Sequence, residues 1–414
     1  MKRKQLIPII AILITLLTSA LLPTTSSEKP NKVRIGVVFP DEQWRNWYQP
    51  VFEEIIQPDI NAYIDKLPDM RFKPDLDIEF LYEDAQGEVG GNAELHLEKV
   101  QYFASIGIDL VIGGFYSGQA GFAVDYMTEN KMLLLSPSST SPGLAHEDDT
   151  LYRLATSDTP QGKALAEMII SLGITNLIVI QNDHQVSQWS YDAFLPEYTE
   201  KGGNILHHIT YDFMAPDAPA ILGEAEIHAT GSADEGILLF TFQEIAEILQ
   251  EAPEHPPIFE LPWFGSETTL TSGNILDNAP DQAIHVGLYG PLTVPDYSSK
   301  YREMAERFEP YTEGSYPYYT ANMIDAAWII TQAVLETKPS FSAPAFSITA
   351  VDVMEVLPDV ASRYYGYSGW CQLDENGDRA NANYEIWGYE IVGTGYSFVK
   401  KGWYDMWTDT MYWD

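Results

Sequence analysis

Residues 109–143 read DLVIGGFYSGQAGFAVDYMTENKMLLLSPSSTSPG. Two short apolar runs, Asp109–Gly113 and Met132–Leu135, flank a segment with a helical pattern, Gln119–Asn130. Continuous apolar runs separated by helices are typical of parallel strands that are buried on both faces of a sheet. The stretch therefore predicts a strand–helix–strand unit of an α/β protein.

The same alternation continues on both sides of this unit. Upstream strands are expected at Val33–Phe39 and Asp77–Tyr82. A second series begins with a helix at Thr159–Leu172, and its expected strands are Asn176–Ile180, Asn204–Tyr211, Gly236–Phe240, Ile258–Phe264 and Ile284–Leu288. Two successive sets predict an α/β fold of two doubly wound parallel-sheet lobes. Hairpin-like segments follow near the end, at 370–373, 384–392 and 396–403.

The composition of the chain excludes some classes of binding partner. The chain has 414 residues and a net charge of -37, which repels nucleic acid and anionic lipid surfaces. Its one cysteine, Cys371, cannot form an internal disulfide. The fold must therefore be held by its hydrophobic cores, and nucleic acid is not an expected partner.

The N-terminus has the pattern of an export signal. Three basic residues, Lys2, Arg3 and Lys4, precede a largely apolar run over 6–22 and a small-polar stretch that ends at Ser27. We expect residues 1–27 to be a signal peptide or an uncleaved N-terminal anchor, which would be the only membrane attachment. The rest of the chain is then exported, to the periplasm or the outer face of the cytoplasmic membrane.

Motifs of catalysis and metal binding are missing from the sequence. It contains no nucleophile elbow, phosphate loop or zinc helix, and its histidines are scattered. Residues 374–385 place oxygen ligands at alternate positions, but Arg379 stands where a calcium loop needs glycine. A polar turn is favoured there. We expect no enzyme activity, no metal and no cofactor.

Three loops at the carboxyl ends of expected strands carry the chemistry of a ligand site. Ser117 stands at the start of a helix, where free amides suit a carboxylate, although a simple helix cap explains it equally. Ser138 and Thr140 lie in a loop held by two prolines, which is either an anion cradle or an ordinary turn. Glu244 can pair with an ammonium group, or merely complement the helix dipole.

At these loops the sequence resembles the leucine/isoleucine/valine-binding protein family, with the type I periplasmic-binding fold. The resemblance runs from about Val33 to the end of the chain, and its clearest stretches are LSPSSTSPGL (135–144), YRLATSDTPQG (152–162), FTFQEIA (240–246) and LDENGDR (373–379) with YEIW (384–387). It implies two lobes joined by a hinge of three strands, with a ligand cleft between them. The first lobe would comprise 33–155 and 289–366, and the second 156–288 and 367–414.

The resemblance also implies roles for particular residues. Ser117, Ser138 and Thr140 match positions that hold a ligand carboxylate, and Glu244 matches one that meets the ammonium group. The family's Asp-x-aromatic-Gly turn is absent here, which leaves Trp189, Tyr191 and Tyr289 as candidates for the aromatic ring that closes over the ligand. Packing roles explain these three rings equally well.

A solute-binding component of an ABC transporter is the function that the resemblance implies. Its partners would be a small zwitterion, an amino acid of the branched-chain type, and the transporter's permease. The alternatives are a ligand-sensing subunit for a membrane receptor, or a binder of an amide, a urea-like molecule or an aromatic acid.

Overall fold

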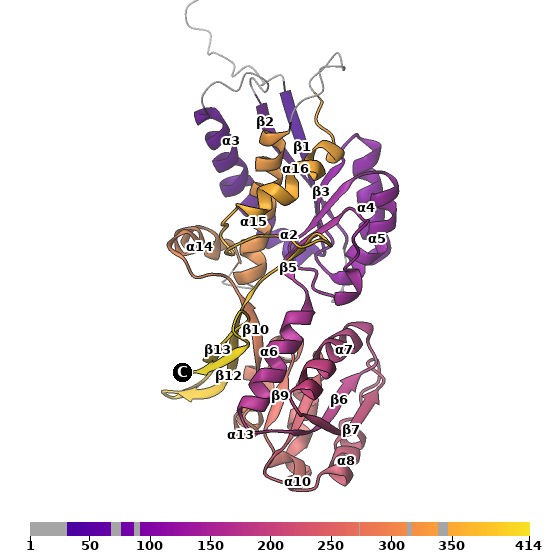
Figure 1. Ribbon diagram of the computed structural model, residues 1–414, viewed down its shortest axis with the longest axis vertical. Helices are drawn as coiled ribbons and strands as arrows, with labels where there is room; N and C mark the ends of the chain where they lie inside the picture. The colour runs from indigo at the N-terminus through magenta and orange to yellow at the C-terminus, as the bar shows by residue number, and fades with distance from the viewer. Residues whose placement is uncertain (1–30, 68–75, 87–91, 273, 313–316, 338–346) are drawn as a thin grey trace, which may run out of the picture.

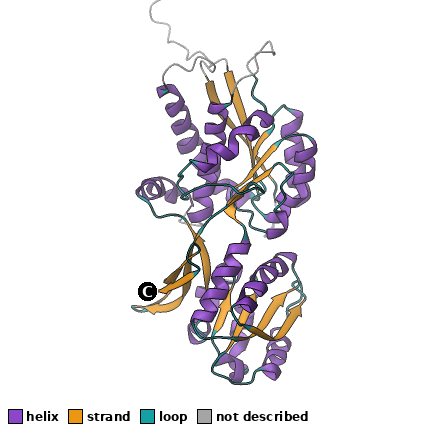
Figure 2. Cartoon of the chain, in the orientation of Figure 1, coloured by secondary structure: helices purple, strands orange, loops and turns teal. Residues whose placement is uncertain are grey.

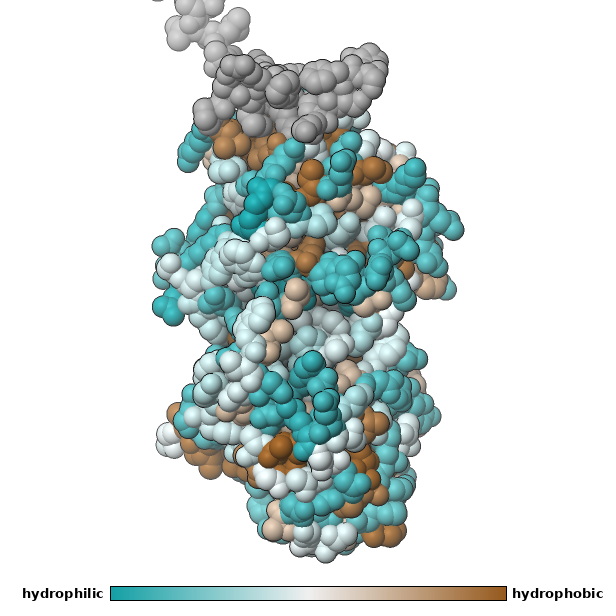
Figure 3. Space-filling view, in the orientation of Figure 1, coloured by the Kyte–Doolittle hydropathy of each residue, from teal (hydrophilic) through white to brown (hydrophobic). Residues whose placement is uncertain are grey.

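The computed structural model describes residues 31–67, 76–86, 92–272, 274–312, 317–337 and 347–414. The expected signal peptide or anchor, residues 1–27, lies outside the described residues. Within the described ranges, every helix is too short or too polar to span a bilayer. Figures 1 and 2 show an elongated molecule of two lobes, one above the other. Polar side chains cover most of the face seen in Figure 3.

The first lobe contains a parallel sheet of six strands in the order β11-β5-β4-β3-β1-β2. The bounds are β1 (Asn31–Phe39), β2 (Leu76–Asp84), β3 (Leu110–Ile112), β4 (Leu133–Ser136), β5 (Leu151–Thr156) and β11 (Asp378–Arg379). The side chains of β1 alternate between the two faces. Ile35 and Val37 enter one apolar core, while Val38 enters the other. Both faces of this sheet are thus buried, as the apolar runs predicted.

Helices cover the first sheet on both faces. One face carries α4 (Ala93–Ser105) and α5 (Ser117–Glu129). The other carries α2 (Glu42–Val51), α3 (Gln57–Lys66), α14 (Ser299–Thr312), α15 (Pro317–Glu336) and α16 (Ala350–Ser362). A π-helical turn, Phe52–Ile56, joins α2 to α3. Helix α15 crosses the centre of this face with most of its side chains buried.

The second lobe contains a mixed sheet of eight strands in the order β14-β13-β12-β10-β9-β8-β6-β7. The bounds are β6 (Asn176–Asn182), β7 (Asn204–Tyr211), β8 (Glu235–Phe240), β9 (Trp263–Gly265), β10 (Tyr289–Val294), β12 (Asn383–Val392), β13 (Gly395–Asp405) and β14 (Thr410–Trp413). Strands β6 to β10 are parallel, and β12 to β14 add antiparallel strands at one edge. The expected hairpin near the C-terminus is confirmed as β12–β13.

The helices of the second lobe also lie on two faces. Helices α6 (Asp158–Ser171) and α7 (Gln185–Glu200) pack on one face of the sheet. The other face carries α8 (Ala218–His228), α9 (Ile245–Glu251), α10 (Pro256–Phe259), α12 (Ile275–Asn278) and α13 (Pro280–His285). The short helix α11 (Glu267–Thr271) follows β9 directly.

One expected strand is wrong in part and another is wrong. Ile258–Phe264 begins in helix α10, and only its end belongs to β9. Ile284–Leu288 covers the end of helix α13 and the turn that precedes β10. Proline stands in the first turn of both helices, where its missing N–H costs nothing and its backbone angle suits a helix. Short apolar runs do not distinguish such helices from strands.

The chain crosses between the lobes at three places in its described part. It crosses at Ser157 between β5 and α6, over 295–298 between β10 and α14, and over 380–382 between β11 and β12. The first crossing lies within two residues of the expected 155–156. The other two were expected at 288–289 and 365–367. Residues 289–294 instead form a strand of the second sheet, and Asp378–Arg379 pair with the first.

A buried ion pair joins the first and third crossings. The guanidinium of Arg153 on β5 binds both carboxylate oxygens of Asp378 on β11, and both residues are almost fully buried. Arg153 Nη1 also donates to the carbonyl oxygen of Ser141, at 2.6 Å. Asp378 is one of the oxygen-bearing residues of the calcium-like pattern at 374–385. Its carboxylate binds the Arg153 guanidinium and not a metal ion.

We expect Asp378→Asn to lower the free energy of unfolding by about 3–5 kcal/mol, because it leaves the Arg153 charge buried without its partner. Urea unfolding followed by circular dichroism measures the change. Asp59→Asn, which removes the carboxylate of the exposed pair with Arg307, is the matched control and should cost less than about 1 kcal/mol. Equal losses in the two variants would show that the buried pair does not stabilise the hinge.

Candidate ligand-binding site

The loop that leads to Ser117 is held in one conformation. Gly114 has a φ of 62°, and a Cβ there would lie 2.9 Å from the Cβ of Ala120. Its N–H donates to Nε2 of His96 on α4, at 2.8 Å. Burial lowers the pKa of His96 to about 4, so the ring is neutral and can accept this bond. Helix α5 then begins at Ser117. The N–H groups of Gln119 and Ala120 donate to the carbonyl oxygen of Tyr116, which leaves those of Ser117 and Gly118 without a partner in the helix.

The hydroxyl of Ser117 connects two loops of the first lobe. Its Oγ accepts from the N–H groups of Thr140 and Ser141, at 3.3 and 3.2 Å. The hydroxyl hydrogen of Ser117 can therefore be donated to a ligand oxygen. The hydroxyl of Ser138, in contrast, donates to the carbonyl oxygen of Phe115, at 2.7 Å. The hydroxyls of Ser117 and Ser138 thus join the loop before α5 to the loop after β4, and we call these two loops the cradle. Only the Ser117 hydroxyl hydrogen stays available to a ligand.

Asp158 brings a carboxylate to this cradle from the first crossing. Its N–H donates to the carbonyl oxygen of Thr140, at 2.8 Å, and the Thr140 side chain hydrogen-bonds to its carboxyl group. Burial and the nearby charge of Glu267 raise the pKa of Asp158 to about 7. The sequence analysis did not select Asp158. The signal for it was an acidic residue in the first turn of a helix within the stretch 152–162.

Glu267 connects the lobes at the same place. Its carboxylate accepts hydrogen bonds from the hydroxyls of Tyr319 on α15, at 2.8 Å, and of Thr293 on β10, at 2.9 Å. Burial raises the pKa of Glu267. Two carboxylates that lie close together away from water favour a proton or a cation between them.

Glu244 lies at the carboxyl end of β8. Strands β8, β9 and β10 are parallel and β10 leads into a crossing, so these ends face the first lobe. Glu244 is 7% exposed, and its Oε1 accepts from Asn182 Nδ2 at 2.8 Å and from the Tyr211 hydroxyl at 2.7 Å. No residue of the described ranges donates a hydrogen bond to Oε2, which leaves that oxygen for a ligand.

The three aromatic candidates occupy different environments. The ring of Trp189 on α7 packs against Gly143 of the first lobe, where a Cβ would lie 2.9 Å from it. Tyr191 is buried in the second lobe against His208 and Phe240. Tyr289 lies at the amino end of β10, the end remote from the crossing, with its ring over Gly388. Trp189 alone of the three is brought to the junction, and a ligand role for each stays a prediction.

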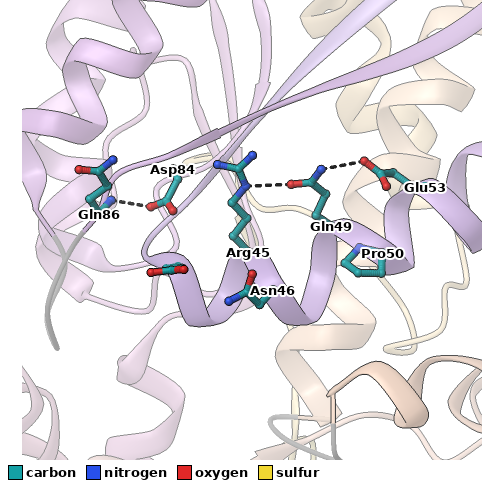
Figure 4. Close-up of a pocket in the computed structure, with 8 residues that line it drawn as sticks. Arg45, Asn46, Gln49, Pro50, Glu53, Asp84 and Gln86 are labelled. Atoms are coloured by element: carbon teal, nitrogen blue, oxygen red, sulfur yellow. Dashed lines mark hydrogen bonds between the residues drawn. The ribbon is translucent and has the colours of Figure 1, made fainter.

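A polar hollow of about 830 Å³ lies between α2 and the end of β2 in the first lobe (Figure 4). Arg45 Nε donates to Gln49, at 2.8 Å, and Gln49 Nε2 donates to Glu53, at 2.7 Å. The cap of α2, Asp41, accepts from the hydroxyl of Tyr116, the residue before Ser117. This hydrogen bond connects the start of α2 to the loop before Ser117. No pattern in the sequence indicated this hollow.

Comparison with known proteins identifies relatives along nearly the whole chain. Residues 58–391 match the family model described as the receptor family ligand binding region. The chain is 25% identical over 398 residues to the uncharacterized protein MJ1266 of Methanocaldococcus jannaschii, with 91% of this chain and 93% of the relative covered.

Solved structures share the two-lobed fold. An ABC-transporter substrate-binding protein from Desulfitobacterium hafniense, in complex with Leu, matches with a TM-score of 0.66 and 18% identity over 89% of this chain and 100% of its own. The leucine-binding protein LivK of Thermotoga maritima matches at 0.63 and 18%, over 89% and 97%. A solute-binding protein from Rhodopseudomonas palustris, in complex with 3,4-dihydroxybenzoic acid, matches at 0.64 and 14%, over 91% and 98%.

The raised pKa of Asp158 predicts a pH-dependent stability. A carboxyl whose folded pKa is about 7 and whose unfolded pKa is about 3.9 stabilises the fold fully below pH 4, and this contribution is lost as the pH rises through 7. We expect Asp158→Asn to flatten the fall in melting temperature between about pH 5 and pH 8. The exposed Asp148→Asn is the control and should keep the wild-type slope. A wild-type slope in Asp158→Asn would contradict the assignment.

The contact between Trp189 and Gly143 allows a steric test of how closely the two lobes approach each other. In Gly143→Val the new side chain meets the Trp189 ring, so we expect the radius of gyration in small-angle scattering to increase. Adding Trp189→Ala should reverse the change. Gly395→Val, at a position with no atom within 4 Å of the new Cβ, is the control. No expansion in Gly143→Val would show that this contact does not limit closure.

Proposed function

Because the chain belongs to the receptor ligand-binding-region family and has the type I periplasmic-binding fold, we propose that it is an extracytoplasmic solute-binding protein that captures a zwitterion. One observation carries the proposal. The Ser117 hydroxyl of the first lobe keeps a donor, while two carboxyl groups, Asp158 at the first crossing and Glu244 in the second lobe, are available as acceptors. The substrate is an amino acid of the branched-chain type.

The cradle suits the carboxylate end of the ligand. Ser117 can donate its hydroxyl hydrogen, and the first N–H groups of α5 lie beside it at the positive end of the helix dipole. The bond from Arg153 to the Ser141 carbonyl oxygen restrains the loop that carries Ser138 and Thr140. A preorganised loop loses little entropy when a ligand binds, which favours affinity.

The carboxyl groups of Glu244 and Asp158 suit the ammonium group of the ligand. Glu244 keeps Oε2 for a ligand donor, while Oε1 is held by Asn182 and Tyr211. Asp158 adds a second acceptor beside Thr140. A bound ammonium group would lower the pKa of Asp158, so uptake near neutral pH should release protons. An acid without an amine would leave these carboxylates uncompensated, which is why an amino acid is preferred over an aromatic acid.

Lobe closure couples binding to delivery. A ligand held by both lobes binds the closed state more tightly than the open state, so it shifts the population toward closure. The closed form would dock on the permease of an ABC transporter outside the cytoplasmic membrane and release its cargo unchanged. Presentation of the ligand to a membrane receptor would use the same closure.

A thermal-shift screen tests the ligand class. We expect one class of amino acid to stabilise the refolded protein, since a ligand at about 100 times its dissociation constant adds roughly 2.7 kcal/mol. Urea, short amides and aromatic acids form the comparison set. Stabilisation by an aromatic acid alone would keep the binding function but discard the amino-acid assignment.

Glu244→Gln tests the ammonium contact. Loss of a charge-assisted hydrogen bond should weaken the amino acid by about 1.5–3 kcal/mol, and its desamino analogue far less. Calorimetric titration measures both ligands. Glu247→Gln, on the exposed face of the same helix, controls for the change in helix charge. Equal losses for the two ligands would remove Glu244 from this role.

A further inference from the structure

A second cavity lies at the hinge, outside the cleft. We call it the hinge groove; its volume is about 830 Å³. Its walls come from the second crossing (Pro295–Tyr297), the third crossing (Arg379–Asn383), the loop after α16 and the β13–β14 turn. In Figure 1, β12 and β13 lie to the left of the crossings, while α5 and α7 of the cleft lie to the right.

Aromatic rings dominate the rim of the hinge groove. Five of them are exposed by more than a third: Tyr297 at 38%, Tyr365 at 38%, Trp370 at 42%, Trp403 at 41% and Trp407 at 81%. Trp403 is stacked on Tyr412 with ring centroids 4.5 Å apart, which fixes its plane. Exposed aromatic surface gathered in one hollow is costly in water and marks a binding site.

The charged groups of the hinge groove are already paired. Asp296 accepts from the Tyr365 hydroxyl, Glu385 binds Lys400 at 3.0 Å, and Asp405 accepts from the Trp407 N–H at 2.9 Å. A free anion would be repelled by these three carboxylates. A cation would compete with partners that the carboxylates already have. The charges therefore disfavour an anion, although only Glu385 has a cationic partner and Asp296 and Asp405 are held by neutral donors.

Uncharged polar groups in the hinge groove lack partners. The side-chain amides of Gln372, Asn381 and Asn383 form no hydrogen bonds with residues in the ranges that the structure describes. Beneath them Arg379 is 4% exposed, and its Nε has no partner although its other nitrogens donate to Leu154, Asn322 and Ser368. The three amides line the groove and can hydrogen-bond to a ligand with many hydroxyls.

We infer that the hinge groove binds a neutral saccharide. A pyranose ring presents C–H groups that stack on the faces of Trp403 and Trp407, while its hydroxyls both donate and accept, as the three amides require. The groove is lined by the second and third crossings, so a sugar held there restrains the segments about which the lobes move. The lining of the hinge groove shares no residue with the amino-acid site proposed above.

Saturation-transfer NMR and tryptophan fluorescence quenching test the inference on the purified protein. The probes are methyl glucoside, methyl mannoside, galactose and N-acetylglucosamine, with benzoate and phenyltrimethylammonium as charged aromatic comparisons. We expect at least one sugar to bind with a millimolar or lower dissociation constant. Trp407→Ala should weaken it at least tenfold without unfolding the protein, because this side chain is 81% exposed.

Two controls locate the sugar. Tyr102→Ala removes an aromatic ring that is 47% exposed on α4, far from the hinge groove, and should leave sugar affinity unchanged. Glu244→Gln should also leave it unchanged. Binding of none of the four sugars, binding of the charged aromatics in their place, or loss of sugar binding in Glu244→Gln would each overturn the inference. None of these results bears on whether the cleft takes an amino acid.

Discussion

The buried charge of Arg153 is the constraint on which the hinge and the ligand loop depend. A guanidinium out of water must be neutralised and its donors satisfied. Asp378 supplies the charge and the Ser141 carbonyl oxygen takes another donor. Because Arg153 lies just before the first crossing and Asp378 just before the third, one interaction fixes both strands and the loop over the ligand site.

Around this pair the crossings are bonded to each other. The Thr156 hydroxyl donates to the carbonyl oxygen of Asn381, at 3.1 Å, and lies 3.2 Å from the hydroxyl of Tyr318. Glu267 then joins β10 to α15 through Thr293 and Tyr319. The lobes themselves are packed cores that do not deform easily. The relative motion of the two lobes is thus concentrated in the three crossings. A ligand in the cleft or in the hinge groove would restrain this motion.

Much of the fold follows from local sequence signals. The apolar runs placed β1 to β4 of the first lobe and β6 to β8 of the second, since buried strands need apolar residues on both faces, but they missed β5 and β10. The expected strand boundaries were wrong where the apolar residues belong to a helix instead, as at 258–264 and 284–288. The two-residue strand β11 has no pattern of its own, because a buried Arg–Asp pair holds it and not apolar side chains. The third crossing lies at 380–382 and not at 365–367 because β11 precedes it, and the second lies at 295–298 because β10 begins only at Tyr289.

The sequence by itself determined the fold class and the loops that carry Ser117, Ser138, Thr140 and Glu244, because strand ends and helix starts are local features. Only the tertiary structure decided which of these groups keeps a free donor or acceptor, because hydrogen-bond partners such as Phe115 for Ser138 come from other loops. The same holds for Asp158, whose raised pKa depends on burial and on Glu267, more than a hundred residues away. It holds for Trp189 as well, which meets Gly143 only because the lobes face each other.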